Sequence, residues 1–185
     1  MAVTLSNNGL TLGSTTINDW DNVGGGKVLQ VVQTVDTTQA VYNYATLNQD
    51  FITATITPSS TSSKILIILN AKIGTTNGNG GIGLRRNTTY IGGSGNNVSG
   101  TNPTYGSNSF VAADDAINGI YQGTGAYNMS NLFHMYLDSP STTSAITYRI
   151  SADSTNLVML GWNRAQANNT AGSGTSTFIL MEIAG

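Results

Sequence analysis

Three glycines in a polar stretch, Gly78, Gly80 and Gly83, match the spacing G-x-G-x-x-G of dinucleotide-binding turns. In those turns the glycines follow a strand and open a helix, whose N-terminus holds the pyrophosphate. An apolar run precedes this match, but the residues after Gly83, LRRNTTYIGG, do not favour a helix. The acidic residue expected about 20 positions later is also absent. We therefore interpret the match as a glycine-rich connection between strands and expect no nucleotide cofactor.

The only histidine, His134, lies within the stretch NLFHMYL. Phe133, Met135 and Leu137 alternate with it, so a strand here would place His134 on its less apolar face. A catalytic histidine needs a nucleophile or carboxylate partner, and a metal site needs further ligands. The sequence suggests neither, and we expect His134 to be an ordinary strand residue.

The carboxylates do not form a recognisable catalytic or metal pattern. Asp114 and Asp115, with Asp138 and Asp153, would suit calcium in chemical type, but no D-x-[DN]-x-[DN]-G spacing is present. Glu182 is the only glutamate and lies within the apolar stretch FILMEIA, without a second carboxylate for acid–base chemistry. We expect Glu182 to make a buried hydrogen bond or a salt bridge, and we expect no enzyme activity and no bound metal.

Composition narrows the classes of partner. Charged residues make up 9% of the 185 residues, the formal net charge is −2, and there are no cysteines. Nucleic acid and anionic membranes attract basic surfaces, so we expect neither as a partner. The N-terminal residues MAVTLSNNGLTLG contain no basic residue and no long apolar block, so we expect no secretion signal and synthesis in a cytoplasm.

Strand patterns dominate the chain, whereas helical periodicity is nearly absent. The best candidate for a short helix is VAADDAING, residues 111–119, which Gly119 would end. Short β-branched or aromatic runs bounded by turn residues predict an all-β fold, an antiparallel β-sandwich or jelly roll. The expected strands are 27–35, 51–58, 64–73, 81–92, 129–138, 145–152, 156–162 and 176–184.

One expected strand, KILIILNAKI at residues 64–73, is apolar on both faces from Ile65 to Leu69. A strand with two apolar faces is typical of the centre of a sheet that is covered on both sides. The core covers one side, and we expect a second copy of the chain to cover the other. Leu66, Ile67 and Ile68 are therefore the candidates for an interface between copies.

The N-terminal region differs from the rest of the chain. Residues 1–26 contain short alternating stretches and end in Gly24-Gly25-Gly26, which indicates an extended arm joined by a flexible hinge to a domain at 27–185. Trp20 and Ile17 are the candidates for anchoring this arm to a larger assembly, because a packed tryptophan often dominates an interface.

The middle of the chain is the candidate for recognition. Residues 74–108 are rich in glycine and poor in large apolar side chains, which is typical of a functional or interface loop. Tyrosines here and shortly after it could stack on sugar rings. The candidates for contact with a glycan are Tyr90, Tyr105, Tyr121 and Tyr127.

Four stretches together resemble small structural proteins of tailed bacteriophages, particularly marine phages and cyanophages: NNGLTLGSTTINDW, SSTSSKILIILNAKIG, YLDSPSTTSAITYRIS and STFILMEIAG. The resemblance covers most of the chain except residues 74–128. It implies an N-terminal virion-associated segment followed by a trimeric jelly roll similar to the tumour-necrosis-factor and C1q domains.

Two functions follow as expectations. In the first, the chain is a trimeric decoration or cement protein, whose arm grips the major capsid protein on the virion surface. In the second, it is a tail-fibre or receptor-binding tip attached to a tail protein, whose residues 74–128 recognise a host surface glycan. A glycan depolymerase lacks the paired carboxylates it would need, and a cellular carbohydrate-binding module would be expected to carry a secretion signal.

Overall fold

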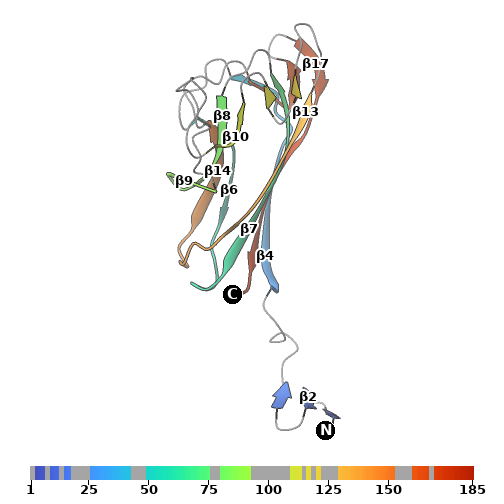
Figure 1. Cartoon of the computed structure of the whole chain (residues 1–185), viewed down its shortest axis with the longest axis vertical. Coiled ribbons are helices and arrows are strands. Elements are labelled where there is room, and N and C mark those ends of the chain that lie inside the picture. Colours follow the sequence, from blue (N-terminus) through green and yellow to red (C-terminus); the bar gives the residue numbers. More distant parts are fainter. Residues whose placement is uncertain are drawn as a thin grey trace.

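All regular elements in the described part of the chain are β-strands. The computed structural model describes residues 26–42, 49–75, 80–92, 109–113, 116–117, 120–121, 129–152, 160–166 and 169–185, together with strands at 3–6, 9–12 and 15–17. Two antiparallel sheets pack face to face, so the prediction of an all-β sandwich is confirmed (Figure 1).

The first sheet is built around β7 (Lys64–Thr75). On one edge β7 pairs with β18 (Ser176–Ile183) and then with the short β15 (Leu160–Trp162). On its other edge it pairs with β13 (Ser130–Asp138) along nine residues. Two outer strands complete the sheet, β4 (Val28–Asp36) beside β18 and β5 (Ala40–Tyr42) beside β15.

The second sheet has the order β10-β8-β14-β6, and β9 also pairs with β8. Its strands are β6 (Asp50–Ile56), β8 (Gly80–Arg86), β9 (Thr89–Ile91), β10 (Ser109–Ala113) and β14 (Ile146–Ala152). Three smaller pairings lie outside the two sheets. They join β1 (Val3–Ser6), β2 (Gly9–Leu12) and β3 (Thr15–Ile17), then β11 (Ala116–Ile117) and β12 (Ile120–Tyr121), and β16 (Arg164–Gln166) and β17 (Asn169–Ser173).

The core lies between the two sheets and follows the two-residue period of the strands. Ile65, Ile67 and Leu69 of β7 are fully buried, as are Tyr148 and Ile150 on the opposite sheet. Each fully buried aliphatic side chain contributes roughly 1.5–3 kcal/mol of transfer free energy. The sandwich is therefore held by a single apolar layer, which fills the inward face of β7 and leaves its other face outside.

The helix expected at 111–119 is wrong. Ser109–Ala113 and Ala116–Ile117 are strands, and Val111, Ala112 and Ala113 pair with Ile82, Gly81 and Gly80. In the strand, the backbone N–H and C=O groups of residues 111–113 pair with β8. A short isolated helix would have to supply all such partners from its own residues. Within the segment expected to be an N-terminal arm, the strands Val3–Ser6, Gly9–Leu12 and Thr15–Ile17 pair with one another.

The sandwich has two distinct ends. We call the first the terminal end, where Ile183 pairs with Val28 and Lys64 and the Ala184 N–H donates to the Lys27 carbonyl (2.8 Å). The C-terminus therefore lies beside the start of β4 (Figure 1). The second is the loop end, where Leu160 pairs with Tyr42 and Thr75.

Candidate functional site: an apolar outward sheet face

Strand β13 presents its apolar side chains to the outside of the sandwich. Phe133, Met135 and Leu137 are 57%, 57% and 49% exposed, whereas the alternating Leu132 and Asp138 are buried. His134 lies on the inward face of β13, on the side opposite Phe133, Met135 and Leu137. This inward face is the less apolar of the two, as the alternation in the sequence indicates. What the sequence did not indicate is that this less apolar face would be the one packed against the core.

The neighbouring strands continue the same apolar surface. Met135 pairs with Ile68, which pairs with Ile179 of β18, and Leu137 pairs with Leu66, which pairs with Met181. Met181 pairs in turn with Val31 of β4. We call this surface the outer apolar face and define it by Val31, Val35, Leu66, Ile68, Phe133, Met135, Leu137, Ile179 and Met181.

Two of the three sequence candidates for an interface lie on this face. Leu66 and Ile68 alternate with fully buried neighbours and are partly exposed. Ile67 is 0% exposed and belongs to the core, so its assignment to an interface is corrected. Strand geometry requires this split, because successive side chains point to opposite faces.

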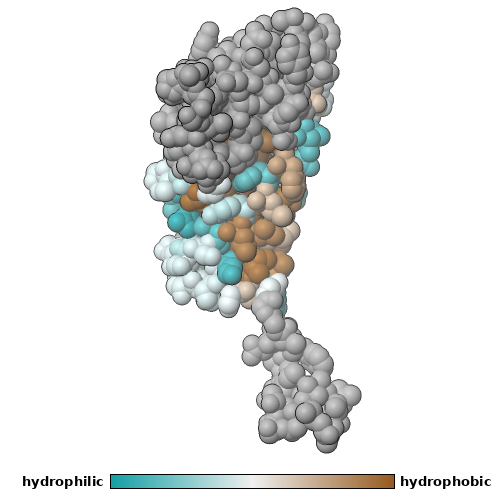
Figure 2. All heavy atoms as spheres, viewed as in Figure 1, coloured by the Kyte–Doolittle hydropathy of each residue, from teal (hydrophilic) through white to brown (hydrophobic). Residues whose placement is uncertain are grey.

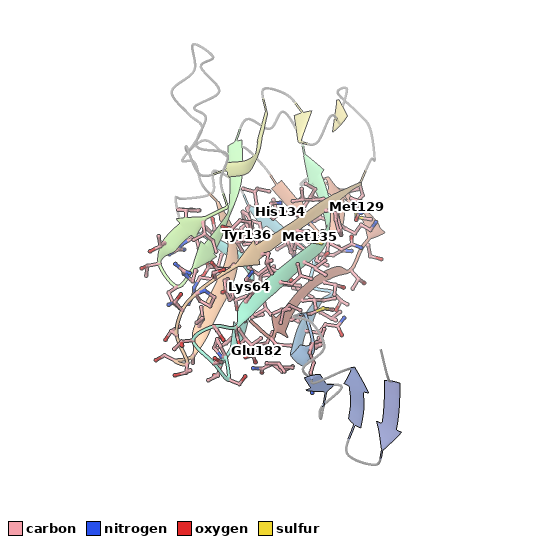
Figure 3. All side chains as sticks on the ribbon, turned by 60° about the horizontal axis from the view of Figure 1, so that its bottom comes forward. Lys64, Met129, His134, Met135, Tyr136 and Glu182 are labelled. Carbon is pink, nitrogen blue, oxygen red and sulfur yellow. The ribbon has the colours of Figure 1, made fainter. Side chains whose placement is uncertain are left out.

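The outer apolar face extends over the side of the sandwich formed by β4, β18, β7 and β13 (Figure 2). Lys64 and Lys72 lie toward the two ends of β7, whereas the row through Ile68 and Met135 is apolar except for Gln33. Figure 3 labels Met135 midway along β13, with Lys64 and Met129 toward opposite ends of the sheet. The row from Phe133 to Val35 passes through Asn70 and Thr177, so the apolar patch is centred on the rows of Leu66 and Ile68. An apolar patch of this kind is typical of a protein–protein contact.

The described carboxylates lie away from this face and have partners inside the fold. Asp138 is buried, accepts two hydrogen bonds from Arg86 Nη1 (3.0 and 3.1 Å), and accepts one from the Tyr148 hydroxyl (2.6 Å). Burial and the nearby Asp138 carboxylate raise the pKa of Tyr148. The Arg86–Asp138 pair joins the two sheets, which gives Asp138 a structural role.

A second ion-pair cluster lies on the outward side of the other sheet. Asp50 accepts hydrogen bonds from Arg85 (3.3 Å), Arg149 (2.5 Å) and the Ser151 hydroxyl (2.6 Å). The Arg85 guanidinium also lies 5.6 Å from the centre of the Tyr90 ring, within the range of a cation–π interaction. Tyr90 is therefore partly buried against a charged cluster.

Several other sequence candidates fall outside the residues whose side chains are described. These are Ile17, Trp20, Tyr105, Asp114, Asp115, Tyr121, Tyr127 and Asp153. Within the described residues, no three His, Cys, Asp or Glu side chains are grouped closely enough to hold a metal ion. No helix in the described part is long and apolar enough to span a membrane.

Glu182 is fully buried near the terminal end and makes hydrogen bonds instead of a salt bridge. Its carboxylate accepts from the Ser59 N–H (2.7 Å), the Ser59 and Ser63 hydroxyls (2.6 Å each) and Gln30 Nε2 (2.6 Å). Burial alone would raise its pKa, but these hydrogen bonds outweigh that effect and lower the pKa to about 2. The carboxylate thereby fixes the β6–β7 turn and the start of β4 to β18.

No protein-family model matches this chain, and no curated protein matches its sequence. The function must therefore be inferred from the geometry of the chain itself. Sequence reasoning identified Leu66 and Ile68 but missed Phe133, Met135 and Leu137 as surface residues. Their alternation was visible, and only the side of β13 facing the core remained to be determined.

We predict that Glu182→Gln destabilises the protein by about 2–3 kcal/mol at neutral pH, because an amide cannot accept the same set of hydrogen bonds as a carboxylate. The folded-state pKa is lowered, from 4.5 to about 2. The stability contributed by the carboxylate is therefore present above about pH 4.5 and is lost as pH falls toward 2. Urea unfolding from pH 7 to pH 2 measures this, with Ser62→Ala in the same turn as the control. A wild-type advantage that stays constant down to pH 2 would contradict the prediction.

We also predict that protonation of His134 destabilises the fold. Burial lowers the pKa of His134 below its ordinary value of 6.5. Its contribution to stability is therefore present above pH 6.5 and is lost as pH falls through the lower folded-state value. Because it is the only histidine, the free energy of unfolding should decrease between pH 7 and pH 5 in wild type and less so in His134→Gln. Equal decreases in both proteins would rule out His134 as the cause.

Proposed function

We propose that this protein is a non-enzymatic structural protein of a tailed-bacteriophage virion, a trimeric decoration or cement protein that stabilises the capsid surface. The observation that carries the proposal is the outer apolar face. Five of its large apolar side chains, on β4 and β13, are each 49–57% exposed. A permanent assembly buries such a surface, whereas a monomer would leave it open to aggregation.

The proposed fold of residues 27–185 is a jelly roll of the tumour-necrosis-factor and C1q kind. Support comes from the strand order, since β4, β18, β7 and β13 neighbour one another in one sheet and β6, β14, β8 and β10 in the other. Along the chain these strands cross repeatedly between the sheets. A jelly roll winds in this way.

The proposed partner on the outer apolar face is a second copy of the same chain. No described carboxylate lies on this face, so it offers little to a partner recognised by charge. Self-association through apolar side chains needs no complementary charge on the partner, which suits a chain with 9% charged residues. The number three follows from the resemblance to trimeric jelly rolls.

The positions of the chain termini suit attachment by one end. Residues 1–26 join the sandwich at the terminal end, where Lys27 bonds to Ala184. In the proposed decoration protein this end faces the capsid and the arm grips the major capsid protein. The described carboxylates already have structural partners, such as Trp162 Nε1 for Asp36 (2.8 Å), which suits a structural rather than a catalytic role.

The second candidate is a tail-fibre or receptor-binding tip. The observation that favours it is that the sandwich has two different ends, the terminal end and the loop end. Strand ends at Tyr42, Asp50, Thr75 and Leu160 lie away from the terminal end. Segments that connect at the loop end would face outward from an attached knob, toward a host surface glycan.

We predict that Met135→Asp dissociates the oligomer into folded monomers, because it places a charge within the outer apolar face without entering the core. Light scattering should report a mass near 19.3 kDa for the variant and about three times that for wild type. Asn131→Asp is the matched control, since Asn131 is exposed on the same side of the same strand but beyond the apolar rows. A Met135→Asp protein with the wild-type oligomeric mass and unchanged circular dichroism would refute the proposed interface.

We predict hundreds of copies of the protein per purified virion, as quantitative mass spectrometry would measure. A capsid lattice offers many equivalent sites, whereas a tail offers sites for only a few trimers. Virions lacking the protein should also lose infectivity faster than wild type on heating and at low salt. A count of a few trimers per particle, with unchanged capsid stability, would exclude the decoration role and favour the tail tip.

A further inference from the structure

The three N-terminal strands form a small antiparallel sheet in the order β1-β2-β3. Leu10 of the central strand pairs with Leu5 on one side and with Ile17 on the other. The next residue, Thr11, pairs with Thr4 and Thr16. Since paired residues share a face of a sheet and successive residues alternate, these two rows belong to opposite faces.

The two faces differ completely in composition. One carries the row of Leu10 and the row in which Leu12 pairs with Val3 and Thr15. The other carries the row of three threonines. The apolar side of this N-terminal sheet carries Val3, Leu5, Leu10, Leu12 and Ile17, together with Thr15, and none of residues 1–18 is charged.

A sheet of this size cannot bury its own apolar side. Three strands of three or four residues form a single layer, and such a layer needs something packed on its apolar face to be stable in water. Within the described part of the chain, β1, β2 and β3 pair only with one another. The covering surface is therefore to be sought outside this sheet.

We propose that the N-terminal sheets of the copies in one oligomer pack their apolar sides against one another and form a short β stalk. The inference rests on the proposed oligomer. Each N-terminal sheet is joined to its sandwich by residues 18–25, which span at most about 25–30 Å when fully extended. Copies that share the outer apolar face therefore hold their N-terminal sheets at a high effective concentration, on the order of millimolar.

Identical sheets also match in chemistry. The apolar side contains only aliphatic residues and a threonine, so packing it on another copy pairs aliphatic surface with aliphatic surface and leaves no charge buried. The threonine side then faces outward. In this arrangement Ile17 contacts other copies of the chain, and Trp20, which follows the stalk, remains the candidate for anchoring to the virion.

Hydrogen exchange of the full-length purified protein, with no virion present, tests the proposal. We expect the backbone amides of residues 9–12 in the oligomer to exchange at least about tenfold more slowly than in the unstructured chain. Leu10→Asp should abolish this protection, because it places a charge on the apolar side. Thr11→Asp, the matched control on the opposite side, should retain it.

Light scattering on the same samples separates this proposal from the proposed function. An intact oligomer whose residues 9–12 exchange at the unstructured rate would overturn the stalk and leave the sandwich interface standing. Protection that survives equally in Leu10→Asp would also overturn it. A monomeric wild-type protein would overturn the proposed oligomer, and the stalk with it.

A second test uses the absence of cysteine from the chain. Leu10→Cys should be joined between copies by a short bis-maleimide, giving cross-linked dimers on a denaturing gel, whereas Thr11→Cys should give far fewer. Equal cross-linking of the two variants would contradict the assignment of the leucine side to the interior of the stalk.

Discussion

The structure depends on one constraint, that β7 is apolar on both of its faces. Ile65, Ile67 and Leu69 fill the core between the sheets, and no further surface is required there. Leu66 and Ile68 on the opposite side are then left with only their sheet neighbours. Those neighbours, on β13 and β18, are apolar as well, so the surface continues across the sheet instead of being interrupted. The core of the sandwich is filled while this outer face stays exposed, which is why we propose that copies of the chain assemble through it.

The scarcity of charge strengthens this argument. Charged residues make up 9% of the chain, and the carboxylates in the described part of it have hydrogen-bond partners within the fold. Asp138 joins the sheets through Arg86 and Tyr148, and Glu182 ties the terminal end together through four hydrogen bonds. Buried charges of this kind fix position more than they add net stability. No described carboxylate lies on the outer apolar face, so the association proposed there would depend on apolar area and shape rather than on attraction between charges.

The sequence predicted most strands because alternation and turn residues are local signals. It failed at residues 111–119, where pairing with β8 decides the structure and no local pattern reports that partner. It also located the outer apolar face only in part. The alternation of Phe133, Met135 and Leu137 with His134 defines two faces, but which face meets the core depends on groups distant in sequence. Asp138 can face inward because Arg86, 52 residues earlier, reaches it from the other sheet. The hydrogen-bond partners of Glu182 could not be predicted from the sequence either, because Ser59 and Ser63 lie more than a hundred residues away along the chain.

The direction of the sandwich, from its terminal end to its loop end, restricts the symmetry that the proposed assembly can have. Chain entry at Lys27 and chain exit at Ala184 lie at one end of the strands. A ring of copies around an axis parallel to the strands keeps every terminal end on the same side, because rotation about that axis does not invert it. A two-fold axis across the strands would instead send the two N-terminal segments in opposite directions, and neither the β stalk nor a single attachment end could form. Attachment through the N-terminal segment therefore favours cyclic packing of the outer apolar face. The proposed trimer would then present three N-terminal segments on one side and three loop ends on the other.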